Sequence, residues 1–197
     1  NTQGFWRMEG NLPNYLTSQY LFEIPDGWAA VHTPKRLLAT GRCRAGGQAG
    51  CGPAIYAIGP WNDGNPPPNN AELSYTTLMQ YGDLTTEQKM ENWADGDIWN
   101  GGAWITAGNK SAVMFAGDKF IGHSYYGYYN GTVYTDIEFD SDFEAMDRGW
   151  MATETKGQMI FYDPADLAAV ASGRLAPYEP QPYAVLDLNE YLFHHAT

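Results

Sequence analysis

Residues 101–115 read GGAWITAGNKSAVMF, and this stretch predicts a β-hairpin. Two runs of mostly apolar residues, 103–106 and 111–115, flank a short segment that contains Gly108 and Asn109. Such runs, separated by a few residues that include Gly and Asn, are typical of paired antiparallel strands. The stretch therefore favours a fold built from antiparallel β-sheets.

The same pattern of short apolar runs bounded by Gly, Pro, Asn and Asp recurs along the chain. It predicts further strands at residues 37–42, 53–58, 77–81, 125–129, 158–162 and 183–188. The first two of these flank a Gly-rich loop, so we expect them to pair. Residues 61–70 contain three consecutive prolines and predict a loop, because proline cannot donate the hydrogen bond that a central strand requires.

One short helix is expected near residues 164–172, directly after the strand at 158–162. Asp163 is a suitable N-cap, Pro164 suits the first helical position, and Gly173 suits the position after the last turn. A second, weaker helical turn is predicted at residues 86–92.

Gly-rich openings followed by two apolar strands recur near residues 27–61, 96–131 and 149–188. A period of roughly 40 to 60 residues is in the range of propeller blades. The sequence thus predicts a mainly-β fold in a single domain, residues 1–197, formed by a β-propeller-like array of small antiparallel sheets. A β-sandwich would contain similar strands and stays open as the alternative fold.

Three runs, at residues 101–113, 160–173 and 178–184, resemble the C-terminal part of uncharacterised secreted bacterial proteins with five-bladed, glycosidase-type β-propellers. The resemblance covers residues 27–193 and rests on strand openings and a strand-to-helix corner. It implies a propeller-like fold and a function in glycan binding or processing. A five-bladed propeller usually needs a longer chain, so the resemblance also implies small blades, or a propeller that another segment or chain completes.

The composition excludes some classes of partner. The net charge is −12 with only 11 basic residues and no run of them, so nucleic acids and anionic membrane surfaces are not expected to bind. No apolar stretch approaches the roughly 18 residues that a membrane-spanning helix needs. Aromatic residues make up 15% of the chain, which suits stacking on sugar rings as well as packing within sheets.

Cys43 and Cys51 are the only cysteines, and the seven residues between them include three glycines. This flexible loop predicts a Cys43–Cys51 disulfide, with two free thiols of a cytosolic protein as the alternative. A disulfide implies an oxidising compartment, so we expect a secreted or cell-surface protein. Asn1 is not an initiator Met, which favours a processed product or a fragment.

Candidate site residues come from loops and strands rich in Gly and aromatic residues. Asp63 and Asp97 are the candidate acid/base pair, because glycoside hydrolysis uses two carboxylates across a cleft. Both also fit the bland interpretation of turn residues that bond their own backbone. The candidate substrate-binding residues, chosen as stacking or polar partners for a sugar, are Trp61, Trp99, Trp104, His123, Tyr125 and Tyr126.

One acidic stretch is a candidate metal site. Acidic residues alternate with others between residues 135 and 144, but an EF-hand beginning at Asp136 would need Gly where Ser141 stands and Glu where Asp147 stands. A looser Ca²⁺ site remains an alternative to a solvated strand face, and otherwise no cofactor is expected. The four histidines form no zinc motif.

Two functions follow from these patterns. The leading hypothesis is a secreted domain that binds or processes carbohydrate, a glycoside hydrolase if it is an enzyme. The alternative is a non-catalytic extracellular structural or assembly subunit. A pocket with two carboxylates beside an exposed Trp would favour the first, and a flat apolar patch or an open sheet edge would favour the second.

Overall fold

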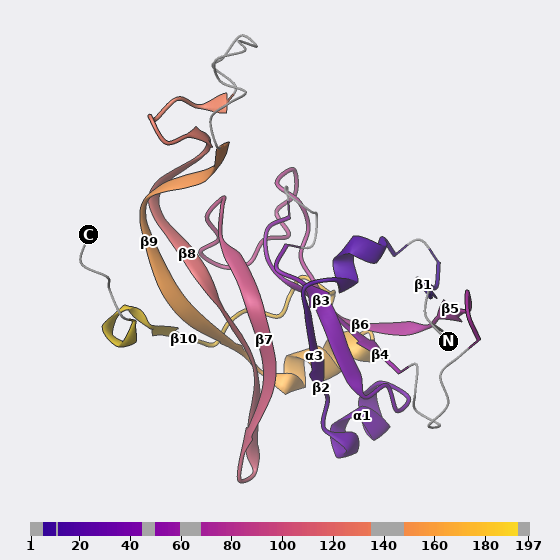
Figure 1. Cartoon of the computed structure of the whole chain (residues 1–197). Helices are drawn as coiled ribbons and strands as arrows, with labels where there is room; N and C mark the ends of the chain where they lie inside the picture. Colours follow the sequence, from indigo (N-terminus) through magenta and orange to yellow (C-terminus); the bar gives the residue numbers. More distant parts are fainter. Residues whose placement is uncertain (1–5, 11, 45–49, 60–67, 135–147, 193–197) are drawn as a thin grey trace.

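The computed structural model describes residues 6–10, 12–44, 50–59, 68–134 and 148–192 (Figure 1). Within these residues the chain is mainly β, as predicted, with three small sheets. They include neither a closed sheet nor a propeller. The propeller-like arrangement is therefore not part of the observed fold of the described residues.

The first sheet is antiparallel, and its strands lie side by side in the order in which they occur in the chain. Its strands are β2 (Tyr20–Glu23), β3 (Leu38–Arg42), β4 (Ala54–Ile58) and β6 (Tyr75–Gln80), in the order β2-β3-β4-β6. The predicted pairing of 37–42 with 53–58 is thus confirmed. Helix α1 (Asp26–His32) connects β2 to β3, and a 3₁₀ turn, η1 (Asn14–Thr17), precedes β2.

The second sheet is also antiparallel and has the order β10-β9-β8-β7. Its strands are β7 (Ile98–Ala107), β8 (Lys110–Tyr128), β9 (Arg148–Tyr162) and β10 (Ala184–Asp187). The far halves of β8 and β9 extend beyond their neighbours as a two-stranded arm (Figure 1). A third, parallel pair consists of β1 (Arg7–Met8) and β5 (Glu72–Leu73).

The predicted hairpin at residues 101–115 is the junction of β7 and β8. Ala107 pairs with Lys110, and the two residues between them form the turn, with Gly108 at φ 61°. The strands are longer than predicted. Residues 125–129, predicted as a separate strand, largely form the far end of β8, since its strand pairing continues through Tyr128.

Helix α3 (Pro164–Ala171) confirms the predicted helix near 164–172. The Asp163 carboxylate accepts a hydrogen bond of 2.8 Å from the N–H of Ala165, and Gly173 has φ 74°. Residues 86–92 are not helical, which corrects the second helical prediction. Helix α1 was not predicted, because Pro25 gives no side-chain cap and Gly27 lies in the first turn.

Two β-bulges decide which side chains of the second sheet face inward. In β7, Trp99 and Asn100 lie opposite the single residue Gly117, so the alternation of faces shifts by one residue. In β8, Gly122 and His123 lie opposite Thr153, and Gly122 adopts φ 78°. The second bulge gives the arm the opposite alternation from the rest of β8.

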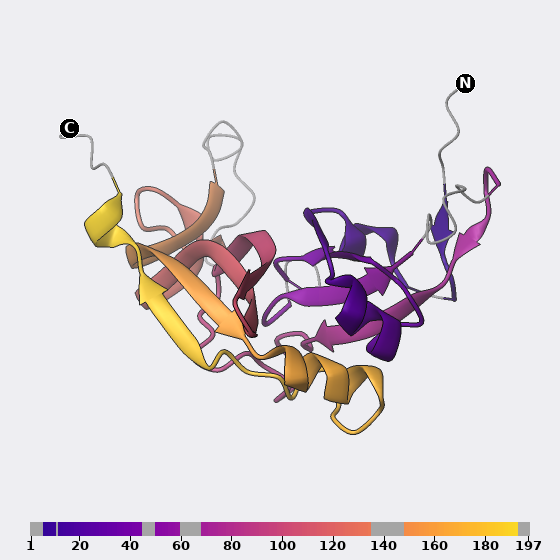
Figure 2. The same ribbon diagram turned by 90° about the horizontal axis from the view of Figure 1, so that it is seen from below.

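The two main sheets meet at β2 and β7. The rings of Tyr20 in β2 and Phe115 in β8 lie 5.3 Å apart, and Trp28 of α1 meets Trp104 of β7 edge-on at 4.8 Å. In the view of Figure 2, helix α3 lies below the first sheet, and it packs on β6. The hydrophobic core is therefore shared between the sheets rather than divided into two.

Candidate functional site

Asp97 lies immediately before β7 and is fully buried. Its carboxylate accepts hydrogen bonds from the backbone N–H groups of Ala94 at 3.0 Å and Phe120 at 2.8 Å. The ammonium group of Lys119 contacts both carboxylate oxygens, at 3.2 and 2.9 Å. Both oxygens are thus engaged within the chain, which is the geometry of a structural carboxylate rather than of one that faces a substrate.

Burial raises the pKa of Asp97, while its backbone hydrogen bonds and Lys119 act in the opposite direction. The other half of the predicted acid/base pair, Asp63, lies outside the described residues, as does Trp61. The described residues therefore provide one carboxylate of that pair, and its oxygens are already hydrogen-bonded within the chain.

Trp99 and Trp104 do not form an exposed stacking surface. Trp99 is fully buried and Trp104 is half-buried against Trp28. In a regular strand, residues five apart would point to opposite faces, but the β7 bulge turns both indoles toward the core. Both rings therefore pack in or against the core rather than at a binding surface.

The remaining predicted site residues lie on the arm formed by β8 and β9. His123 is exposed and its ring lies 5.5 Å from that of Tyr125. Tyr126 points to the other face, where its ring lies 5.6 Å from Trp150 and 5.8 Å from Tyr134. The predicted trio is thus divided between the two faces of the arm.

A contact between this arm and Arg44, in the loop after β3, was not predicted from the sequence. The guanidinium group of Arg44 lies 5.8 Å from the ring centre of Trp93 and 5.4 Å from that of Trp150. Its Nε donates a 3.0 Å hydrogen bond to the carbonyl of Asp97. Burial lowers the pKa of Arg44. Arg44 therefore joins the loop after β3 to the arm of the second sheet.

At the far end of the arm, the guanidinium group of Arg148 lies 4.7 Å from the centre of the Tyr134 ring. The aromatic arm cluster, defined here as Tyr126, Tyr134, Arg148 and Trp150, combines ring faces and edges with a cation. Such groups suit stacking and hydrogen bonding to polar ligands. No sequence signal connects its members, because Tyr126 and Trp150 meet only through strand pairing.

The outward face of the second sheet, opposite the core, has an unusual composition. Between Lys110 and Asp118, every residue that points outward is Gly or apolar: Gly101, Ala103, Ile105, Ala112, Met114, Ala116, Met159, Phe161, Ala184 and Leu186. Ile105 is 39% exposed and Leu186 is 43% exposed, while Met114 and Met159 at the centre are half-buried and Ala112 is buried. A sheet face that meets water normally carries polar residues at such positions.

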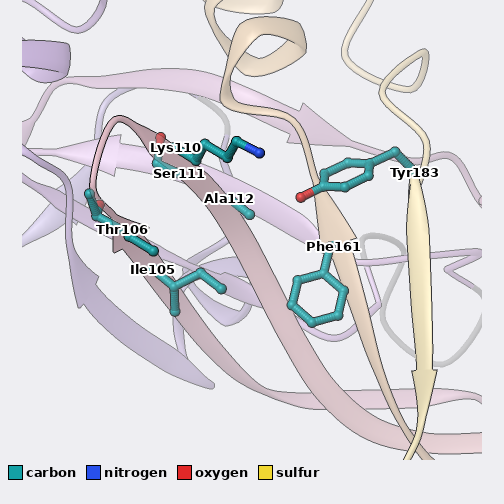
Figure 3. A pocket seen from close by; sticks show the side chains of 8 residues that line it. Ile105, Thr106, Lys110, Ser111, Ala112, Phe161 and Tyr183 are labelled. Atoms are coloured by element: carbon teal, nitrogen blue, oxygen red, sulfur yellow. The ribbon is translucent and has the colours of Figure 1, made fainter.

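A shallow hollow of about 260 Å³ opens at one end of this face. It is lined by Ile105, Thr106, Ala107, Lys110, Ser111, Ala112, Phe161 and Tyr183. Lys110 and Tyr183 point toward one another across it, above Ala112 and Phe161 (Figure 3). The hollow contains no carboxylate, so it does not match a hydrolase cleft.

The predicted Cys43–Cys51 disulfide is corrected by the structure, in which the two buried cysteines are not bonded to each other. The backbone N–H of Cys43 donates to the side chain of Gln19 at 2.7 Å. The N–H of Cys51 donates to the carbonyl of Gly82, and its carbonyl accepts from Met90, each at 2.9 Å. The two residues are thus held by different segments of the chain.

The described residues contain no group of three His, Cys, Asp or Glu side chains placed to hold a metal ion. The acidic stretch considered for Ca²⁺, residues 135–144, lies outside them.

Among the helices of this part of the chain, none has the length and apolarity needed to cross a membrane. Comparisons with family models, curated proteins and solved structures give no match to this chain.

Proposed function

We propose that this chain is a non-catalytic assembly subunit whose second sheet binds a partner sheet through the outward face. The observation that supports this proposal is the unbroken apolar composition of that face between Lys110 and Asp118. Single exposed apolar residues are common, but a contiguous patch on a sheet is typical of an interaction surface. The extracytoplasmic location expected from the sequence loses its main support, because Cys43 and Cys51 are not bonded to each other.

The hollow beside Ile105 and Phe161 supports a folded partner whose sheet carries large side chains on its contact face. Two sheets that pack face to face lie about 10 Å apart and interdigitate their side chains. A hollow of this size accepts one large apolar side chain from the opposite sheet.

Hydroxyl-radical footprinting tests the proposal. Oxidation of Met114 and Met159 is measured by mass spectrometry in the isolated chain, diluted to about 0.1 μM so that any self-association is negligible, and in material recovered natively from its source. We expect both residues to be protected in the native material and oxidised in the isolated chain. The fully buried Met79 should be protected in both samples, and Tyr129, which is 77% exposed, should be oxidised in both. Equal oxidation of Met114 and Met159 in the two samples would overturn the proposal.

Carbohydrate binding is the second candidate function, and the aromatic arm cluster favours it. The rings of Tyr126 and Trp150, with Arg148 over Tyr134, offer stacking surfaces and charged donors. A glycan array tests this candidate, with Trp150→Ala as the variant and Tyr183→Ala, which is distant in the sheet, as the control. Silence of the unmodified chain on the array rejects it.

A further inference from the structure

The outward face is complementary to itself, and this property identifies its partner. We infer that a second copy of this chain binds there, face to face, about a two-fold axis that crosses β8 at the level of Met114. The inference rests on the proposed function, since it names the partner of the same surface. The charge and the shape of the face support it, and the area of the face sets the expected strength of the contact.

The charges at the two ends of the face have opposite sign. Lys110 and Asp118 both point outward from β8, both are exposed, and each lies four residues from Met114. The two-fold axis lies between the two sheets, parallel to their faces, and crosses β8 at a right angle at the level of Met114. The two β8 strands therefore run in opposite directions. Lys110 of each copy then lies over Asp118 of the other, so the contact contains two ion pairs with no unbalanced charge.

The shape of the face has the same symmetry. At the Asp118 end, Leu192 rises over the outward side of β9, where its Cδ1 lies 2.8 Å from the position a Cβ on Gly157 would occupy. Leu192 is 49% exposed. At the Lys110 end lies the hollow lined by Ile105 and Phe161. The same two-fold axis brings Leu192 of one copy over the hollow of the other.

The area of the face sets the expected strength of the contact. β7 and β8 span about 27 Å of this face, but β9 ends at Tyr162 and β10 has only four residues, so strands about 4.8 Å apart give about 400 Å² per copy. Two copies would bury about 800 Å², which is the size of a weak, transient interface. The chain has a net charge of −12, which opposes association of two copies. We therefore expect a weak dimer whose population changes between roughly 1 and 100 μM.

Sedimentation velocity of the full chain over this concentration range tests the inference. The unmodified chain should shift from monomer to dimer, and Met114→Glu should remain monomeric. Lys110→Glu and Asp118→Lys should each weaken dimerisation about tenfold, and the double variant should recover most of the loss, because the reversed charges face each other again. Val31→Glu is the matched control, since Val31 is 73% exposed on α1, a helix that meets β7 on the opposite, inward side through Trp28 and Trp104.

The charge reversals keep the test decisive if Met114→Glu fails to fold, because both charged residues are exposed. Reversals that leave the dimer unchanged, or a double variant that is no better than either single variant, would overturn the two-fold arrangement. A chain that sediments as a monomer throughout would overturn the inference. If Met114 and Met159 are nevertheless protected in native material, the proposed function survives and the partner is another chain. If they are equally oxidised, both fail.

Discussion

The ammonium group of Lys119 lies 2.9 Å from Oδ2 of Asp97, and the Asp97 side chain is fully buried while that of Lys119 is 12% exposed. Asp97 precedes β7 and Lys119 belongs to β8, so the pair fixes the start of one strand against the middle of the next. A buried ion pair is costly to break, because the remaining partner keeps its charge without compensation.

Lys119→Met is therefore expected to lower the free energy of unfolding by about 3 kcal/mol near neutral pH. Chemical denaturation measures this change. Lys156→Met is the matched control, because Lys156 forms only surface pairs, at 3.7 Å with Glu154 and 3.8 Å with Asp187. The control should cost at most about 1 kcal/mol. Similar losses in both variants would contradict the structural role of Asp97.

The pH dependence of stability gives a second test of Asp97. Burial raises its pKa in the folded protein above the unfolded value of about 3.9. The contribution of Asp97 to stability is thus complete below about pH 3.9, the pKa in the unfolded chain, and is lost as the pH rises through the pKa in the folded protein. In Lys119→Met the pKa should rise further, so the deficit of this variant should shrink on acidification. A deficit that is constant with pH would contradict this assignment.

Arg44→Lys should destabilise the chain by about 1–2 kcal/mol although the charge is retained, because the planar guanidinium group lies within cation–π distance of two indoles. Thermal unfolding measures the loss, and near-UV circular dichroism should report an altered environment of Trp93 and Trp150. Arg7→Lys, at an exposed pair with Glu72, is the control and should change neither signal. An unchanged near-UV spectrum in Arg44→Lys would argue against the stack.

The two cysteines should behave as protected thiols. Iodoacetamide without reductant should label neither residue in the folded chain and both after denaturation, since both are buried and burial raises the pKa of the Cys51 thiol. Mass spectrometry counts the added groups. A denatured chain that takes up no label until it is reduced would establish the disulfide after all.

Gly117→Ala should destabilise the second sheet by about 3 kcal/mol or more, because a Cβ there would lie 1.9 Å from the carbonyl oxygen of Ile98 in the bulged strand β7. Gly27→Ala is the contrasting variant. A Cβ at Gly27 meets nothing within 4 Å, and the residue is in α1, so a gain of up to about 1 kcal/mol is expected. Comparable effects at both positions would contradict the close approach of β7 to β8.

The regular parts of the fold could be predicted because their signals are local. The hairpin turn at Gly108 and the cap at Asp163 each depend on residues adjacent in the sequence. The long arm was missed because Gly117 and Gly122 interrupt the pattern of β8, and glycine weakens the expectation of a strand.

The site could be predicted less well, because its geometry depends on bulges and strand register. The β7 bulge turns Trp99 and Trp104 inward together, contrary to the alternation of a regular strand. Arg44 and Trp150 are distant in the sequence and meet only after both sheets have formed. The outward apolar face required the register of all four strands, since no single strand carries it.

The position of α3 has a consequence for how the molecule unfolds. The chain leaves β9, crosses to the first sheet, where Pro177 accepts a 2.8 Å hydrogen bond from Gln80, and returns to form β10. The Tyr81 hydroxyl reaches both the Tyr162 hydroxyl, at 3.3 Å, and the Pro180 carbonyl. This segment thus couples the edge strand of the second sheet to the first sheet. The two sheets should therefore melt in one cooperative transition, although each is a separate hydrogen-bonded unit.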